Sequence, residues 1–288
     1  MSPQPFYACG HSGRELQRLE DQGAYFRGIT RSFLQTAGIT RGMQVLDIGC
    51  GTGDVTFLLA ELVGPTGSVL GIDRAPEAIA AAAAHATSRG IDHVAFELGE
   101  VERLAPRPMD AVVGRFVLMH QASPARTLRA AAASAVRGGL LAVLESDISA
   151  SVARVHSRPH SPTYDRINVW LAKVINAAGT HPDMGLRLRQ TFVDAGLPPP
   201  TLWLQARVEG GRDAEIYHYI SESIRSMLPT AERLGIAPLS PVDLDELERQ
   251  LRDEVIASGG VLTSPLVVGA WCRLPQRSAH DDPLEAMK

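Results

Sequence analysis

The chain has 288 residues, of which 45% are hydrophobic, 21% charged and only 5% aromatic, and its formal net charge is −4. This length fits one large domain or one domain with a substantial insertion, and the composition excludes a disordered or collagen-like chain. The mildly acidic balance argues against a broad surface that binds phosphate backbones. Only Lys173 and Lys288 among the 28 basic residues are lysines. GC-rich codons explain this bias most simply, although many carboxylate or phosphate clamps would also produce it.

The first half of the chain predicts one long helix and then a regular alternation of strands and helices. Residues 11–37 are predicted to be helical, because apolar side chains recur there at helical spacing. Short apolar runs predict strands at 43–48, 68–73, 93–98, 110–114 and 139–145. The segments between them predict helices at 54–63, 76–89 and from 124 to about 136. Such repeats indicate a doubly wound parallel sheet, which binds its ligand outside the carboxyl ends of the strands.

The second half is less regular. Residues 147–162 are rich in Ser, Arg, His and Pro and predict a loop. Further helices are predicted at 163–178, 184–195, 213–227 and 241–257, and further strands at 201–209 and 265–274. With these two strands the predicted sheet has seven.

The ends and the cysteines limit the cellular setting. The N-terminus has no apolar segment of the secretory type, and no run reaches the roughly 18 apolar residues that a membrane span requires. Cys9, Cys50 and Cys272 are widely scattered, which fits neither a disulfide framework nor a zinc site. We therefore expect a cytoplasmic protein in a reducing compartment.

The strongest motif is the segment 45–55, with the sequence VLDIGCGTGDV, which predicts a strand, a glycine-rich turn and a helix. A dinucleotide-binding loop has the pattern G-x-G-x-x-G and holds a pyrophosphate at the helix N-terminus. Here the glycines are Gly49, Gly51 and Gly53, and Asp54 occupies the position of the third glycine. A carboxylate facing a pyrophosphate is electrostatically unfavourable. The acidic loop instead suits a positively charged ligand without phosphate, such as S-adenosylmethionine.

Residues 40–146 resemble the class I S-adenosylmethionine-dependent methyltransferases. The N-terminal arm and the C-terminal half are similar, less specifically, to small-molecule methyltransferases of the ubiquinone/menaquinone and secondary-metabolite type. The matching segments are V-L-D-I-G-C-G-T-G (45–53), G-I-D (71–73), G-E (99–100), M-D-A-V-V (109–113) and V-R-G-G-L-L-A-V-L-E (136–145). Together, in this order, they are far more specific than a lone glycine motif. The resemblance implies an α/β, Rossmann-like, doubly wound and mostly parallel seven-stranded sheet.

The resemblance also implies a division of the chain. We expect an N-terminal helical arm or lid (1–40), a cofactor-binding core (41–146), a helical insertion that shapes an acceptor pocket (147–200), strands and helices that complete the sheet (201–275), and a flexible tail (276–288).

The methionine end of the cofactor would lie against the glycine loop and the fourth strand. By resemblance, Asp47 would receive the ammonium group directly or through water. Gly49, Gly51 and Gly53 would let the backbone approach the cofactor, because no Cβ stands in the way. Arg115 would meet the methionine carboxylate in a bidentate pair, or it would pair with a neighbouring acid instead.

The adenosine end would lie against the second and third strands. Asp73 would accept both ribose hydroxyls, or alternatively cap the next helix. Arg74 would stack on the adenine or remain solvated. Glu100 stands where the family usually has Asp, and its carboxylate would take the adenine amino group. Val101 would offer its backbone N–H to the ring.

Methyl transfer from a sulfonium is an in-line displacement that needs mainly proximity and alignment, and an oxygen nucleophile usually also needs a base. His120 is the candidate base, because it follows the predicted fourth strand. Its alternative role is to cap the turn before Ser123 and Pro124. Glu145, at the end of the fifth predicted strand, is a candidate base or substrate-orienting residue, and its alternative is an ion pair with an arginine.

Three residues outside the predicted core are candidates for binding the acceptor, namely Tyr25, Tyr217 and His218, although each also fits ordinary helix packing. His156 and His160 have an i, i+4 spacing that metal sites use, but Pro159 between them interrupts a helix. We therefore expect no metal site.

The sequence thus predicts an enzyme that transfers a methyl group from S-adenosylmethionine to an oxygen, carbon or nitrogen of a small, largely apolar metabolite, leaving S-adenosylhomocysteine. The alternatives are a non-methylating enzyme on the same fold, which catalyses a cyclisation, elimination or hydroxylation, and a non-catalytic cofactor-binding protein. Neither a nucleic acid nor a membrane is an expected partner, because no basic or base-stacking groove is visible. The base rate for soluble enzymes favours a homodimer.

Overall fold

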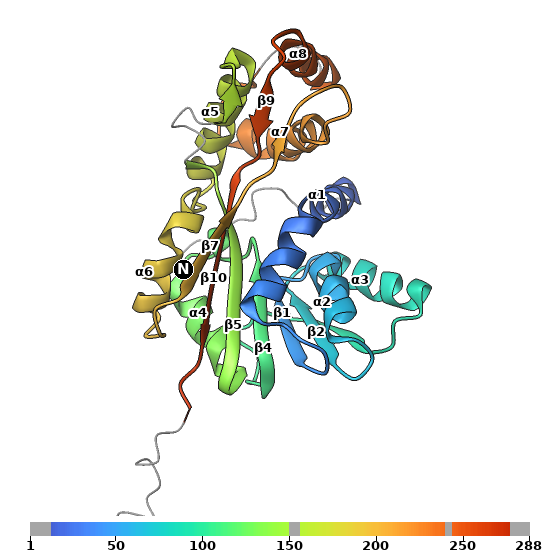
Figure 1. Ribbon diagram of the computed structural model, residues 1–288, viewed down its shortest axis with the longest axis vertical. Helices are drawn as coiled ribbons and strands as arrows, with labels where there is room; N and C mark the ends of the chain where they lie inside the picture. Colours follow the sequence, from blue (N-terminus) through green and yellow to red (C-terminus); the bar gives the residue numbers. More distant parts are fainter. Residues whose placement is uncertain (1–12, 150–155, 240–243, 277–288) are drawn as a thin grey trace, which may run out of the picture.

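A computed structural model describes residues 13–149, 156–239 and 244–276. Its centre is a seven-stranded sheet with the order β3-β2-β1-β4-β5-β10-β7 (Figure 1). The strands are β1 (Gln44–Ile48), β2 (Ser68–Asp73), β3 (Val94–Leu98), β4 (Met109–Arg115), β5 (Ala135–Asp147), β7 (Thr201–Gln205) and β10 (Leu266–Arg273). Strands β1 to β5 are parallel, and β10 runs antiparallel between β5 and β7. The predicted sheet, mostly parallel and seven-stranded, is confirmed.

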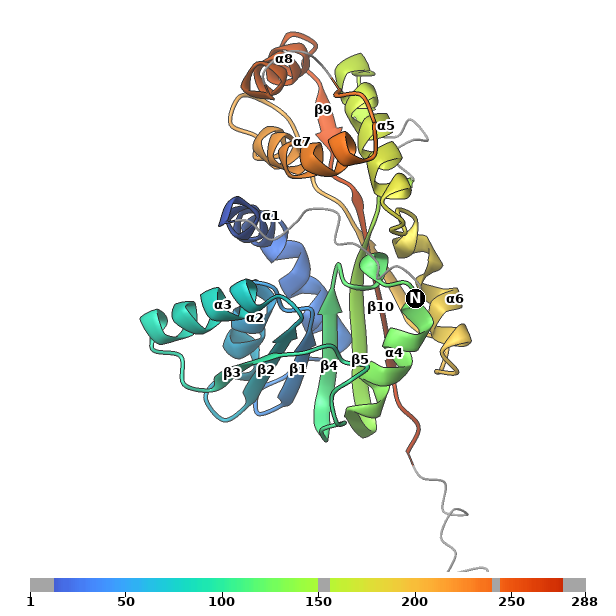
Figure 2. The same ribbon diagram turned by 180° about the vertical axis from the view of Figure 1, so that it is seen from behind.

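Helices cover both faces of this sheet (Figures 1 and 2). They are α1 (Gly13–Ala37), α2 (Asp54–Val63), α3 (Pro76–Arg89), the 3-10 turn η1 (Leu118–His120), α4 (Pro124–Ala133) and α6 (Met184–Asp194). Buried side chains of α1 and α2 pack with one set of strand residues, and those of α4 and α6 pack with the alternate set. This alternation is what a strand with two buried faces requires.

A smaller layer lies beyond the carboxyl ends of the strands. It contains helices α5 (Pro162–Ala177), α7 (Ile216–Arg233) and α8 (Leu244–Ala257), and a three-stranded sheet of β6 (Ser157–Arg158), β9 (Val261–Thr263) and β8 (Val208–Glu209). Figure 2 shows this group above the central sheet, with the N-terminal end of α1 beneath it. The N-terminal part of α1 therefore lies between the small layer and α2, close to the edge of the sheet where a ligand is expected.

Three details of the sequence prediction are wrong. The predicted strand 201–209 is divided, because the chain leaves the central sheet after β7 and joins the small sheet as β8. Strands β6 and β9 were not expected, since two or three residues are too few to form a recognisable pattern. Helix α7 continues through Pro229 to Arg233, where buried Thr230 and Ala231 hold its last turn. Residues 1–12 of the predicted arm and 277–288 of the predicted tail lie outside the described residues.

Within the described part of the chain, no helix is both long enough and apolar enough to cross a membrane.

The strand order places the binding edge. The chain starts in the middle of the sheet with β1, builds outward through β2 and β3, and then crosses back to add β4 on the other side of β1. The connections after β1 and β4 therefore leave in opposite directions and open a crevice between them. This crevice lies under the small helical layer (Figures 1 and 2).

Candidate functional site

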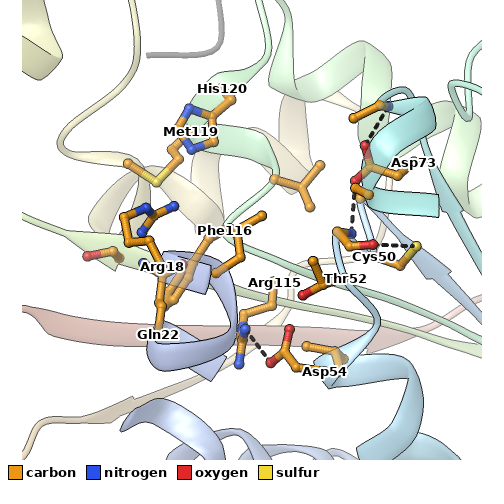
Figure 3. Close-up of a pocket in the computed structure, with 18 of the residues that line it drawn as sticks. Arg18, Gln22, Cys50, Thr52, Asp54, Asp73, Arg115, Phe116, Met119 and His120 are labelled. Atoms are coloured by element: carbon orange, nitrogen blue, oxygen red, sulfur yellow. Dashed lines mark hydrogen bonds and ion pairs between the residues drawn. The ribbon is translucent and has the colours of Figure 1, made fainter. Parts of the chain in front are cut away.

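A cavity occupies this crevice. It is lined by the carboxyl ends of β1 to β5, by the loops that follow them, and by residues of α1, α5 and α7. Figure 3 shows its lower part, where the glycine loop after β1 faces the start of α1 and the turn after β4. The cavity thus joins the central sheet to the small helical layer.

The glycine loop is shaped by close backbone approaches. Gly49 has φ +65°, and a Cβ there would lie 2.5 Å from Cγ2 of Val117, so only glycine fits. Gly53, with φ +91°, does not line the cavity, and its Cβ would lie 3.0–3.1 Å from the rings of Phe57 and Phe96. Gly49 and Gly51 therefore form the cavity wall, whereas Gly53 allows α2 to pack closely on the sheet.

Asp73 anchors the loop from the neighbouring strand. Its Oδ2 accepts a hydrogen bond from the Gly51 N–H, and its Oδ1 accepts one from the Ala75 N–H, both at 2.9 Å (Figure 3). Helix α3 is capped at Ala75 and not by the side chain of Asp73. Because each carboxylate oxygen can accept a second hydrogen bond, Asp73 presents two fixed acceptors at the edge of the cavity.

Asp47 lies below the loop and does not line the cavity. Its Oδ2 accepts a hydrogen bond from the Thr56 hydroxyl at 2.6 Å. Burial outweighs the hydrogen bond from Thr56 and, together with the charge of nearby Asp54, raises the pKa of Asp47 to about 7. The structure therefore corrects the expectation of direct ligand contact by this residue and gives it a role under the loop.

The predicted adenosine residues Arg74, Glu100 and Val101 all line the cavity. The Glu100 carboxylate is already paired with Nε of Arg103 at 3.0 Å, and the Arg103 side chain is largely exposed. An exposed pair of this kind contributes little to stability and is readily rearranged.

Arg115 pairs with an acid, as the alternative interpretation of the sequence stated. Its Nη2 lies 2.6 Å from Oδ2 of Asp54, and its Nη1 donates to the Thr30 hydroxyl at 3.2 Å (Figure 3). The side chain is only 7% exposed. The pair joins β4 to the N-terminus of α2, and the bond to Thr30 ties both to α1. Arg115 is thus engaged within the cavity wall.

Helix α1 packs closely against Asp54 at Gly23. A Cβ on Gly23 would lie 2.6 Å from Oδ2 of Asp54, whereas a Cβ on Gly28 would meet nothing within 4 Å. We expect Gly23→Ala to lower the free energy of unfolding by roughly 1–3 kcal/mol, because the helix must move away from α2. Gly28→Ala, the matched control, should raise it by roughly 0.5–1 kcal/mol. Urea denaturation checks both, and equal effects would contradict this contact.

His120 lines the cavity at the end of η1. Burial, together with the positive charges of Arg18 and Arg74, lowers its pKa to about 3. Figure 3 shows the Arg18 side chain extending from α1 toward Met119 and His120. The imidazole is therefore neutral at physiological pH and able to accept a hydrogen bond from a ligand.

Glu145 does not line the cavity, and its contacts give it a structural role, so its predicted catalytic role stays a prediction that this geometry does not support. The residue is fully buried, and its carboxylate accepts backbone hydrogen bonds from Val117 (2.9 Å), Leu118 (2.7 Å) and Met119 (3.3 Å). These are the otherwise unpaired amides at the start of η1. Burial raises the pKa of Glu145 to about 7, and the three hydrogen bonds oppose this rise. Glu145 thus fixes the turn that presents His120.

Tyr25, a predicted acceptor-binding residue, is also part of the core. Its hydroxyl donates to Oε1 of Glu209 at 2.6 Å, and its ring stacks on Tyr219 with the centroids 4.4 Å apart. The guanidinium of Arg207 lies over the Tyr25 ring, 4.1 Å from its centroid. Tyr219, which lines the cavity, is an aromatic residue that the sequence interpretation missed.

Tyr217 and His218 do not line the cavity either. Tyr217 is fully buried and donates to the Gly211 carbonyl at 3.1 Å. His218 is exposed and lies 3.6 Å from Oδ2 of Asp21 on α1. The predicted helix is correct, but a different face of it lines the cavity. The residues of that face are Tyr219, Ile220, Ser223, Ser226 and Met227. Their helical spacing is visible in the sequence, but the sequence does not reveal which face points to the cavity.

Two other groups were missed in the same way. Helix α1 contributes Arg18, Leu19 and Gln22, and helix α5 contributes Tyr164, Asn168, Leu171 and Ile175. Each group follows the i, i+3, i+4 spacing of one helix face. The only sequence signal for them was this periodicity, which core positions share.

Comparison with known proteins gives a consistent picture. A family model described as a methyltransferase domain matches residues 39–183. Nocamycin O-methyltransferase from Saccharothrix syringae is 43% identical over 76 residues, which cover 26% of this chain and 27% of that protein. The match thus spans about a quarter of the relative's length.

Two solved structures share the fold. An S-adenosylmethionine-dependent methyltransferase from Aquifex aeolicus has a TM-score of 0.50 at 18% identity, over 71% of this chain and 95% of that one. The [4+2]-cyclase SpnF has a TM-score of 0.51 at 19% identity, over 86% of this chain and 80% of that one. At these identities the likeness shows the fold alone.

Proposed function

Because the chain belongs to the family of methyltransferase domains, we propose that it transfers a methyl group from S-adenosylmethionine to an oxygen, carbon or nitrogen atom of a small, largely apolar metabolite. The observation that carries this proposal is the position of Asp73. Its two oxygens are fixed by the glycine loop at the switch point of the sheet, beside a loop whose acidic residue disfavours a pyrophosphate.

The residues present fit this cofactor. Gly49 and Gly51 form a cradle that a Cβ would fill at Gly49. The buried Oγ1 of Thr52 lines the cavity and has no hydrogen-bond partner among the described residues, so a polar ligand group would satisfy it. A cavity with acidic side chains and backbone amides suits a ligand that carries hydroxyls, an amino group and positive charge.

We assign the cofactor groups to the residues accordingly. Asp73 would accept the ribose hydroxyls, the Glu100 carboxylate would accept the adenine amino group, and the Val101 N–H would donate to the ring. Arg74 would lie beside the adenine. The Arg115 guanidinium is already held by Asp54, so it would meet the methionine carboxylate only with its remaining N–H groups. Asp47 would act on the ammonium group through the loop or a water molecule.

When bound, the cofactor supplies a methyl group with a neutral leaving group, so the protein's task is alignment. The walls formed by α1, α5 and α7 would exclude water and hold the acceptor about 3–3.5 Å from the methyl carbon. His120 would accept a hydrogen bond from the attacking group and take its proton as the bond forms. A histidine with so low a pKa is a weak base, so its main contribution would be to orient the attacking group by accepting its hydrogen bond.

We expect His120→Ala to lower kcat by roughly 10²–10⁴-fold if it removes the base, with little change in affinity for S-adenosylhomocysteine. His93→Ala, on a histidine bound to the Ala60 carbonyl away from the cavity, is the control and should keep kcat. Since the pKa of His120 is lowered to about 3, the neutral base persists through pH 5, and kcat should lack an acid limb near pH 6.5. A fall in kcat below pH 6.5 that disappears in His120→Ala would contradict the lowered pKa of His120.

A thermal shift measurement tests the cofactor assignment directly. S-adenosylmethionine and S-adenosylhomocysteine should each raise Tm, whereas NAD, which carries a pyrophosphate, should not. A shift with NAD alone would overturn the proposal.

A second candidate function is a non-methylating reaction, such as a cyclisation, on the same cofactor-binding fold. SpnF, which is a [4+2]-cyclase, shares this fold, so the fold alone does not decide between the two functions. The two functions differ in one product, because only methyl transfer accumulates S-adenosylhomocysteine with turnover.

A further inference from the structure

Helices α5 and α7 of the small layer, which lies above the central sheet (Figure 2), line one part of the cavity. We call this region the acceptor chamber and define it by Asn168, Leu171 and Ile175 of α5 and Ile220, Ser223 and Met227 of α7. None of the residues that these two described helices contribute to the cavity lining carries a charge. A buried ionic group on the acceptor would have no partner there, and burying an unpaired charge is costly.

The polar atoms of the chamber are mainly hydrogen-bond acceptors. Asn168 is 3% exposed, and its Nδ2 donates to the Tyr164 carbonyl at 3.0 Å. Because only the NH₂ end of the amide can donate to a carbonyl, this bond fixes the side chain, leaves Oδ1 as an acceptor and leaves the second N–H of Nδ2 as a donor.

Ser223 also presents a hydrogen-bond acceptor to the chamber. Its hydroxyl donates to the Tyr219 carbonyl at 2.7 Å, which uses its single hydrogen and leaves its lone pairs. A ligand group in the chamber is therefore matched best by an uncharged donor. A hydroxyl meets this condition, whereas an ammonium or a carboxylate does not.

The apolar part of the chamber favours a flat ring. Tyr219 lines the cavity, and its stacking on Tyr25 at an interplanar angle of 3° fixes its ring. Leu171, Ile175 and Met227 supply flexible apolar surface around it. Rigid aromatic and aliphatic walls of this kind bind the apolar body of a ligand, and a few placed polar groups set its orientation.

We propose that the acceptor is an uncharged ring compound with a hydroxyl group, and that Oδ1 of Asn168 and Oγ of Ser223 select it as alternative acceptors of that hydroxyl's single hydrogen bond. This inference rests on the proposed function, because it takes the chamber as the acceptor's half of the cavity. The acceptor thus presents two groups: the hydroxyl that binds in the chamber, and a separate atom beside His120 that receives the methyl group.

Binding of 2-naphthol and 2-methylnaphthalene tests the proposal, because the two molecules have nearly the same shape and differ in the hydroxyl. Calorimetric titration uses the full chain saturated with S-adenosylhomocysteine. The wild type should bind 2-naphthol roughly tenfold more tightly, as expected for one buried acceptor left unpaired by the hydrocarbon. Asn168→Leu should reduce this ratio to about threefold or less, and Ser223→Ala should reduce it in part. Asn176→Leu, an exposed position of the same helix outside the cavity lining, should leave the ratio unchanged.

Binding of S-adenosylhomocysteine to each variant is measured first and shows that the variant is folded. Failure of the wild type to bind S-adenosylhomocysteine would count against the proposed function. Intact S-adenosylhomocysteine binding with no preference for 2-naphthol, with neither probe bound, or with an unchanged preference in both Asn168→Leu and Ser223→Ala would overturn the present inference alone.

Discussion

Asp73→Ala is expected to lower the affinity for S-adenosylmethionine by about 100-fold or more. The substitution removes the two carboxylate oxygens that we assign to the ribose hydroxyls, and hydrogen bonds to charged groups contribute roughly 1.5–3 kcal/mol each. It also releases the Gly51 and Ala75 N–H groups, so the glycine loop loses its support from β2. Isothermal titration calorimetry of the purified protein measures the loss.

The controls separate charge from geometry. Asp73→Asn keeps one acceptor oxygen and should show an intermediate loss. Asp92→Ala changes an exposed aspartate outside the cavity lining and should bind like the wild type. An affinity within threefold of the wild type for Asp73→Ala would place the ribose elsewhere and refute this assignment.

Glu145→Met is expected to lower the free energy of unfolding by roughly 2–6 kcal/mol, since it leaves two buried backbone N–H groups and one part-buried one without an acceptor, and each buried group costs roughly 1–3 kcal/mol. The backbone strain at Phe116, which precedes the three amides held by Glu145, adds to this loss of stability. Phe116 has φ +56°, an unusual conformation for a bulky side chain, and the carboxylate holds the amides that follow it.

Denaturant unfolding of Glu145→Met and Glu145→Gln checks this role. The glutamine retains one acceptor oxygen, so its destabilisation should be smaller. A variant that loses less than about 1 kcal/mol of stability but all of its turnover would instead restore Glu145 as a base.

Local patterns in the sequence were sufficient to predict the sheet and the glycine loop. The strands 43–48 and 68–73 are continuous apolar runs followed by turn residues, and this arrangement needs no information from distant parts of the chain. Asp73 and Gly49 follow from the same logic, because the carboxyl ends of parallel strands meet at one edge. These are the positions at which sequence and structure agree.

The errors arose where a side chain's direction depends on distant packing. Asp73 ends β2 and Glu145 lies near the end of β5, yet Glu145 is covered by the turn at 117–119 whereas Asp73 faces the cavity. Tyr25 and Tyr219 stack on each other, and only the rotation of α7 against α1 decides which of them reaches the cavity. The period of an amphipathic helix does not fix that rotation, because core and cavity faces are both apolar.

The measurement that tests the central claim most directly follows the methyl group itself. The purified protein is incubated with S-adenosylmethionine bearing an isotopically labelled methyl group and with a crude metabolite extract, and the products are analysed by mass spectrometry. The account predicts a small molecule that carries the label, together with an equal amount of S-adenosylhomocysteine, and neither product with Asp73→Ala. Conversion of a metabolite without label transfer and without S-adenosylhomocysteine would contradict methyl transfer and support the non-methylating alternative.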